Sequence, residues 1–192
     1  MGNQSASLPH AGSSAHKHVS QVIVLVGFMG AGKTTVGEEL ARLLAWSFED
    51  LDDRIQSREG RTIEEIFRDS GEPEFRRFEH MALRELLCEA KSEHSVIALG
   101  GGTFAEARNV SMLQDMNVPS VFLDAPVEEL FRRCRQQRLN RPLRQGEANF
   151  RKLYETRLPL YMSATYHIET DGKPIEQIAA EIVRIVGISP SK

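Results

Sequence analysis

The sequence has few of the residues and patterns that mark several large classes of protein. It contains only two cysteines, Cys88 and Cys134, and their spacing indicates neither a metal site nor a disulfide framework. No apolar run approaches the length of a membrane span, and the first 18 residues contain no stretch that could form a signal-peptide core. The net charge of −3 provides no general attraction to nucleic acid or to an anionic membrane. We therefore expect a cytoplasmic protein that binds neither.

The composition predicts one compact domain. With 41% hydrophobic residues the chain can bury a sizeable core, but 192 residues are too few for two domains of ordinary size. Residues 1–19 are rich in glycine, serine and alanine, and we expect them to form a disordered leader. The domain should then span residues 20–188, and we expect it to be a monomer.

Short apolar runs rich in β-branched residues alternate with segments of helical periodicity. The runs lie at residues 21–26, 46–49, 95–99, 119–123 and 165–169. Consecutive apolar positions are typical of strands that are buried on both faces of a parallel sheet. Helices are predicted over 33–44 and 174–186. The alternation predicts an α/β fold, a three-layer α/β/α sandwich with a parallel sheet of about five strands.

Two segments interrupt this alternation and are interpreted as parts that handle the substrate. A long helical insertion at about 52–90 is broken near Gly60 and Gly71. The segment 138–149 is polar and rich in arginine, and it separates two predicted helices. We interpret it as a lid, whose positive charge would attract an anionic ligand.

Residues 27–34 read Gly-Phe-Met-Gly-Ala-Gly-Lys-Thr and fit the Walker A pattern, with a strand before them and a helix after them. The glycines allow backbone N–H groups to point at phosphate oxygens, and the helix N-terminus adds its positive dipole end. Lys33 would reach the β and γ phosphates, and the Thr34 hydroxyl would bind Mg²⁺. The chain lacks the Asn-Lys-x-Asp motif that specifies guanine and is short for a motor or a helicase. The pattern therefore favours a P-loop small-molecule kinase.

The second predicted strand ends in Asp50-Leu51-Asp52, at the sheet edge where open α/β folds bind their ligands. One carboxylate could support hydrated Mg²⁺, and the other could hydrogen-bond or deprotonate an acceptor hydroxyl. Alone, the pattern is equally typical of solvated acids or helix caps. We expect the neighbouring Asp53 to cap the following helix.

Two further features are candidates for an acceptor site. A predicted helix carries Arg76 beside an apolar stripe, and Glu79 lies one turn later. Without other support these two residues are interpreted as a surface ion pair, although Glu79 could also orient Arg76 or contact a substrate. Residues 100–102 are three consecutive glycines at the end of a buried strand, so a ligand could approach the backbone closely there.

In combination, these motifs resemble the shikimate kinase family over about residues 22–170. The series consists of Walker A, Asp-x-Asp, Gly-Glu-x-x-Phe-Arg, the triple glycine, Arg141-Pro142-Leu143 and Arg157-Leu158-Pro159-Leu160-Tyr161. The resemblance implies phosphorylation of the 3-hydroxyl of shikimate with ATP, in chorismate and aromatic amino acid biosynthesis. It also implies one Mg²⁺ ion for each subunit.

The resemblance also assigns roles to individual residues. Asp52 would contact the ring hydroxyls, Arg76 and Arg157 would bind the carboxylate, and the backbone of residues 100–102 would line the ring. Asp50 would hold Mg²⁺ through water. The nucleotide would contact Gly30, Ala31, Gly32, Lys33, Thr34, Thr35, Arg138 and Arg141. Arg138 would pack on adenine, Arg141 would close with the lid onto the phosphates, and the catalytic residues would be Lys33, Asp52 and Arg141.

The chain departs from the family pattern in the lid, where Arg144 occupies a position that is usually leucine. Two other interpretations compete with a shikimate kinase. A gluconate kinase, or another P-loop sugar kinase, would share the strand, phosphate loop and lid without needing the triple glycine. A nucleotide-binding regulatory module that has lost catalysis would have no chemical reason to retain all of the site residues. The basic cluster has no interleaved aromatic residues that would favour nucleic-acid binding.

Overall fold

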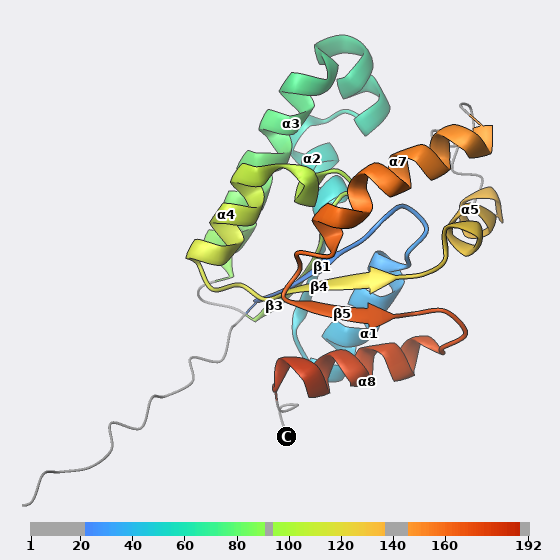
Figure 1. The fold of residues 1–192 in the computed structure, drawn as a ribbon. Coiled ribbons are helices and arrows are strands. Elements are labelled where there is room, and N and C mark those ends of the chain that lie inside the picture. Colours follow the sequence, from blue (N-terminus) through green and yellow to red (C-terminus); the bar gives the residue numbers. More distant parts are fainter. Residues whose placement is uncertain (1–21, 91–93, 137–145, 189–192) are drawn as a thin grey trace, which may run out of the picture.

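The computed structural model describes residues 22–90, 94–136 and 146–188, and these form a sheet of five parallel strands (Figure 1). The strands, in chain order, are β1 (Val22–Val26), β2 (Ser47–Asp50), β3 (Ser95–Ala98), β4 (Ser120–Asp124) and β5 (Tyr166–Glu169). Their order across the sheet is β2-β3-β1-β4-β5. The predicted fold class is confirmed, and each strand lies within one or two residues of its predicted position.

The central strand β1 has all five of its residues buried. It pairs with β3 on one side, where Val24 lies opposite Ile97, and with β4 on the other, where Val24 lies opposite Ser120. A strand with neighbours on both sides and helices over both faces can present only apolar side chains. This explains the unbroken Val-Ile-Val-Leu-Val run in the sequence.

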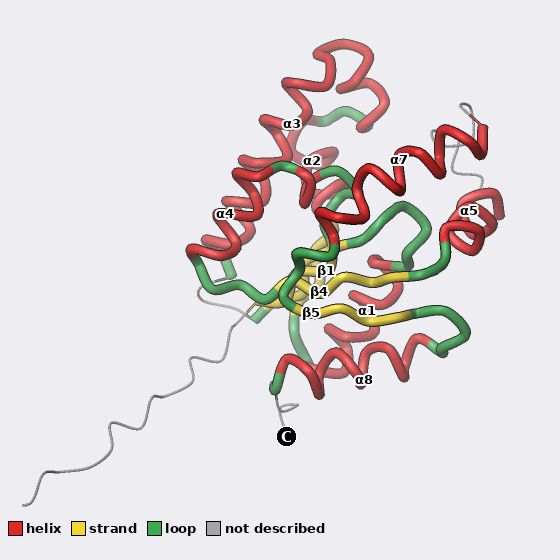
Figure 2. Tube along the Cα trace, in the orientation of Figure 1, coloured by secondary structure: helices red, strands yellow, loops and turns green. Residues whose placement is uncertain are grey.

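Helices cover both faces of the sheet, with α1 and α8 on one face and α3, α4 and α7 on the other (Figures 1 and 2). The helices are α1 (Lys33–Leu44), α2 (Leu51–Glu59), α3 (Ile63–Glu89), α4 (Ala107–Asp115), α5 (Val127–Gln136), α7 (Gly146–Tyr161) and α8 (Ile175–Val186). A short 3₁₀ turn, η1 (Thr103–Ala105), follows the triple glycine. The predicted helices at 33–44 and 174–186 are confirmed.

The predicted helical insertion corresponds to α2 and α3. Gly60 ends α2 in a left-handed conformation, and Gly71, at φ 78° and ψ 174°, kinks α3 just before Pro73. The expectation that Asp53 caps the helix is wrong. Asp50 is the N-cap of α2, because its carboxylate accepts a hydrogen bond from the backbone N–H of Asp52 at 3.0 Å, and Asp53 lies inside the first turn.

The predicted lid, residues 138–149, falls mostly outside the described residues, and only its last four residues are seen, at the start of α7. Arg138, Arg141 and Arg144 therefore lie outside the described residues. The chain leaves β1, β2 and β3 at the carboxyl edge of the sheet, since the strands are parallel. Walker A, Asp-x-Asp and the triple glycine lie at these three strand ends, which brings together motifs that are far apart in the sequence.

Candidate active site

The phosphate loop joins β1 to α1, and its glycines have conformations that other residues adopt only with strain. Gly27, Gly30 and Gly32 have φ angles of 149°, 82° and 85°. At Gly30 there is also no room for a side chain, because a Cβ atom would lie 2.7 Å from the Leu130 carbonyl oxygen and 2.9 Å from Cys134 Sγ. The loop is therefore held against α5, and it leads directly into the N-terminus of α1.

Lys33 and Thr34 begin α1 and face the loop and the end of β2. The Lys33 ammonium donates to the carbonyl oxygens of Gly27 and Phe28 at 3.0 and 3.1 Å. Burial lowers the pKa of Lys33, and the nearby carboxylates of Asp52 and Asp50 oppose that change. The side chain thus lies folded over its own loop, within reach of two acids, where a phosphate could replace the carbonyl contacts.

Asp50 and Asp52 have separate surroundings, as their expected division of roles requires. The Thr34 hydroxyl donates to Asp50 Oδ2 at 2.9 Å, so a hydroxyl and a carboxylate oxygen meet beside the phosphate loop. These are oxygen ligands of the kind that Mg²⁺ prefers, directly or through water. Within the three described ranges, no group of three or more histidine, cysteine, aspartate or glutamate side chains gathers as a metal site. The donor set therefore fits an ion that is held largely by phosphate oxygens and water.

Asp52 lies deeper and has a strongly perturbed acidity. Burial and the neighbouring carboxylates of Asp50 and Glu79 raise the pKa of Asp52 to about 6, whereas the Lys33 ammonium opposes the rise. A carboxylate with this pKa is mostly ionised at neutral pH and is a stronger base than an exposed aspartate. Such a group is suited to accept a proton from a hydroxyl.

Three successive glycines follow β3, and each borders a different functional group. A Cβ atom at Gly100 would lie 2.8 Å from Asp52 Oδ1. At Gly101 it would lie 3.6 Å from Arg157 Nη1, and at Gly102 it would lie 2.5 Å from Arg76 Nη1. None of the three is among the described residues of positive φ, so space rather than backbone conformation accounts for glycine at positions 100 and 102, whereas a Cβ atom at Gly101 would make only ordinary van der Waals contacts.

The same segment borders the phosphate loop. The Cβ position at Gly101 is 3.8 Å from the backbone nitrogen of Met29 and 3.9 Å from the Gly27 carbonyl oxygen. An acceptor that lies on the triple glycine would therefore lie next to the terminal phosphate of a bound nucleotide. Transfer in line requires this adjacency.

Arg76 projects from α3 toward Gly102, and its side chain is only 14% exposed. Its guanidinium donates to Glu79 at 2.5 Å and to Glu72 at 2.9 Å. Glu79 is 1% exposed, so the interpretation of Arg76 and Glu79 as a simple surface pair is wrong, and the alternative that Glu79 orients Arg76 is supported. The outer partner, Glu72, is 64% exposed, and an incoming carboxylate could displace it.

Arg157 reaches the site from α7, on the opposite side of the triple glycine. Its Nη1 donates to the Gly101 carbonyl oxygen at 3.0 Å, and its guanidinium lies over the Phe28 ring, 5.9 Å from the centroid. The Tyr161 hydroxyl donates to the same carbonyl oxygen, and burial raises the pKa of Tyr161 to about 12. Two guanidinium groups thus contact adjacent residues of one turn. This arrangement suits a carboxylate, which binds well to planar forks.

The structure brings together most of the residues that the sequence predicted for the site. Lys33, Asp52, Arg76 and Arg157 converge on the phosphate loop and the triple glycine. Ala31 is buried within the loop, and Thr35 is exposed on α1. Thr103 and Asn109, which are polar and buried behind Arg76, were not predicted from the sequence. No local pattern distinguishes them, because their partners on α3, Glu79 and His80, are far away in the chain.

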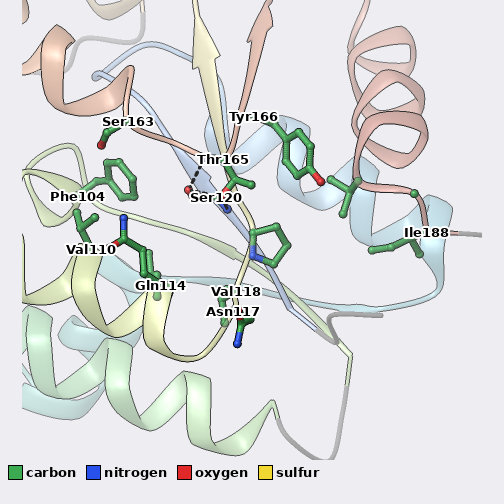
Figure 3. Close-up of a pocket in the computed structure, with 14 residues that line it drawn as sticks. Phe104, Val110, Gln114, Asn117, Val118, Ser120, Ser163, Thr165, Tyr166 and Ile188 are labelled. Atoms are coloured by element: carbon green, nitrogen blue, oxygen red, sulfur yellow. Dashed lines mark hydrogen bonds between the residues drawn. The ribbon is translucent and has the colours of Figure 1, made fainter. Parts of the chain in front are cut away.

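A pocket of about 420 Å³ lies elsewhere, at the amino ends of β4 and β5 (Figure 3). Its walls include Phe104, Leu113, Ser120 and Tyr166, and none of the described residues that line it carries a charge. It cannot hold the nucleotide of the phosphate loop, which is at the other edge of the sheet. Among the described residues, no helix is both long enough and apolar enough to cross a membrane.

Comparisons with known proteins agree with this geometry. The family model described as shikimate kinase matches residues 29–186. A shikimate kinase of Thermus thermophilus is 42% identical over 164 residues, covering 84% of this chain and 87% of its own length. The shikimate kinase of Persephonella marina is 37% identical over 161 residues, covering 84% of this chain and 96% of its own length. The structure of shikimate kinase from Acinetobacter baumannii in complex with shikimate is 40% identical, with a TM-score of 0.78, and the match covers 86% of this chain and 92% of that one.

Proposed function

The chain belongs to the shikimate kinase family and phosphorylates shikimate with ATP, and from that premise we propose a role for each residue of the site. The observation that carries the proposal is the triple glycine, whose three residues border Asp52, Arg157 and Arg76 in turn. A flat ring lying on this backbone would present its carboxylate to the two arginines. Its hydroxyls would point to Asp52, next to the phosphate loop.

In the proposed reaction, the 3-hydroxyl oxygen of shikimate attacks the γ phosphorus of ATP in line. The bond from that phosphorus to the β–γ bridging oxygen breaks, and ADP leaves with the electron pair. Asp52 takes the hydroxyl proton on a carboxylate oxygen, a role that agrees with its raised pKa of about 6. No covalent intermediate with the protein is formed, because positioning and charge stabilisation account for most of the catalysis of phosphoryl transfer.

The nucleotide would lie along residues 30–35, with backbone N–H groups at its phosphates. Lys33 would exchange its contacts with the carbonyl oxygens of Gly27 and Phe28 for the β and γ phosphates. Thr34 would bind Mg²⁺ directly and Asp50 through water. When bound, the ion would neutralise phosphate charge.

The proposal extends to features that lie outside the described residues or that concern the whole protein. Arg141 would meet the phosphates when the lid closes, and Arg138 would pack on adenine. We further propose that a single domain over 20–188 acts as a cytoplasmic monomer with one Mg²⁺, with the acceptor site on the insertion at 52–90 and the lid at 138–149. ATP and shikimate would be its ligands.

Replacement of Arg157 by alanine tests the acceptor site directly. Removing one of the two guanidinium groups leaves a bound carboxylate with Arg76 alone and with part of its charge unpaired, so shikimate affinity should fall by several kcal/mol. Isothermal titration of shikimate against wild type and Arg157→Ala measures the loss. Arg151 on the same helix has a side chain that is 40% exposed and pairs with Glu128 at 2.7 Å, so Arg151→Ala is the matched control. Equal shikimate affinity in wild type and Arg157→Ala would show that Arg157 does not bind the carboxylate.

A further inference from the structure

A series of hydrogen bonds runs from Arg76 away from the acceptor site and into α4. Arg76 donates to Glu79 at 2.5 Å, and the Thr103 hydroxyl donates to the same carboxylate at 2.6 Å. The Asn109 side-chain amide donates to the Thr103 carbonyl oxygen at 2.9 Å, and its oxygen lies 2.8 Å from His80 Nδ1. Residues from α3, η1 and α4 are thus joined into one network.

The middle of this network is fully buried. Thr103 and Asn109 are 0% exposed and Glu79 is 1% exposed, whereas His80 is only partly buried. Over the described part of the chain, no buried side-chain nitrogen or oxygen lacks a hydrogen-bond partner. A buried polar network that is fully satisfied fixes the positions of its members, because every broken bond leaves a polar atom without water.

The direction of each bond follows from the groups involved. The Thr103 carbonyl can only accept, so the Asn109 amide must turn its NH₂ toward it. The Asn109 oxygen then faces His80 Nδ1, which must carry a proton and donate. An aspartate at position 109 would place an oxygen against the Thr103 carbonyl oxygen and could not complete the network without an extra proton.

Core packing and α4 both hold this turn in place. Phe104, the residue after Thr103, is 2% exposed within the hydrophobic core and also lines the pocket in Figure 3. On the other side, Arg108 of α4 donates to the Arg76 carbonyl oxygen at 2.7 Å. The first turn of α4 therefore holds both the turn η1 and the backbone of Arg76.

We propose that Asn109 and His80 are positioning residues for the acceptor carboxylate. They hold Thr103 and Glu79 so that the Arg76 guanidinium stays beside Gly102, although neither touches the substrate. This inference rests on the proposed function of Arg76. The contact between α3 and α4, which lies outside the acceptor site, would then contribute part of the shikimate affinity.

The test compares shikimate and ADP affinities by titration calorimetry. Asn109→Asp should weaken shikimate binding about tenfold or more, the effect of losing one buried hydrogen bond beside a charged group, and leave ADP affinity within about twofold of wild type. Gln114→Glu makes the same amide-to-acid change at an exposed position of α4 and should alter neither affinity. Wild-type shikimate affinity in Asn109→Asp, or an equal loss for both ligands, would overturn the inference.

A second pair of variants keeps the test decisive if Asn109→Asp folds poorly. The amide nitrogen of asparagine can take the place of Nδ1, so His80→Asn should retain shikimate affinity, and His80→Leu should lose it while ADP affinity stays. Equal shikimate affinity in these two variants would overturn the inference. Arg76→Ala distinguishes a failure of the role proposed for Arg76 from a failure of the roles proposed for Asn109 and His80. If it binds shikimate as wild type does, the proposed function of Arg76 fails; if it loses binding while Asn109→Asp and His80→Leu do not, only the inference fails.

Discussion

Replacing Asp52 by asparagine should make the protein more stable and inactive at the same time. The Asp52 pKa is raised from 3.8 to about 6 by burial and by the carboxylates of Asp50 and Glu79. Since one pKa unit corresponds to about 1.4 kcal/mol, keeping this carboxylate ionised costs the folded state at most about 3 kcal/mol at neutral pH. Asparagine has nearly the same shape and no charge, so Asp52→Asn should unfold at a temperature several degrees higher, while phosphoryl transfer is lost.

The pH dependence distinguishes this cause from any other source of stability. A carboxyl whose folded pKa is raised destabilises the protein fully above about pH 6, and the cost shrinks as pH falls and disappears only below the unfolded pKa of 3.8, where both states are protonated. Urea unfolding of wild type and Asp52→Asn at about pH 7.5 and pH 4 should therefore show a difference in stability that is much smaller in acid. Asp53→Asn is the control, because Asp53 is exposed. An Asp52→Asn variant no more stable than wild type at pH 7.5, or a stability difference that does not change with pH, would show that the charge of Asp52 does not destabilise the folded state.

Two further substitutions test the ends of the site. Gly102→Ala places a Cβ atom 2.5 Å from Arg76 Nη1, so the guanidinium must move away from Glu79. Calorimetry should then show shikimate affinity about tenfold weaker and ADP affinity retained. Unaltered shikimate affinity would argue against a contact between Arg76 and the acceptor. Lys33→Ala removes the ammonium beside the phosphate loop, so ADP release should cease while shikimate still binds. Turnover that persists in this variant would contradict the role of the loop lysine.

The elements that sequence analysis predicted well are those specified by local patterns. The consecutive apolar residues of β1 and the glycine spacing of the phosphate loop are properties of a few neighbouring residues, and the structure confirms both. That Lys33 and Asp52 lie close together followed from one further rule, that parallel strands end at one edge of the sheet. The placement of Arg76 in the site was implied only by the resemblance to the family.

The features that were missed depend on contacts between distant residues. Glu79 resembled an ordinary surface partner of Arg76, and only its burial beneath Thr103, 24 positions later, shows its place in the site. Asp53 was expected to cap α2 because acids often do, but the backbone turns at Asp50, which takes that role. His80 and Asn109 are 29 residues apart, and no periodicity relates them.

The most direct test of the account is ADP release from Mg-ATP with shikimate, with gluconate and with no acceptor, followed in the wild type and in Asp52→Asn. We expect rapid ADP release with shikimate alone, accompanied by formation of shikimate 3-phosphate, and loss of both in the variant. Equal ADP release with gluconate would indicate that the acceptor is a sugar acid. ATP binding without turnover on any acceptor would contradict the account and indicate a regulatory module.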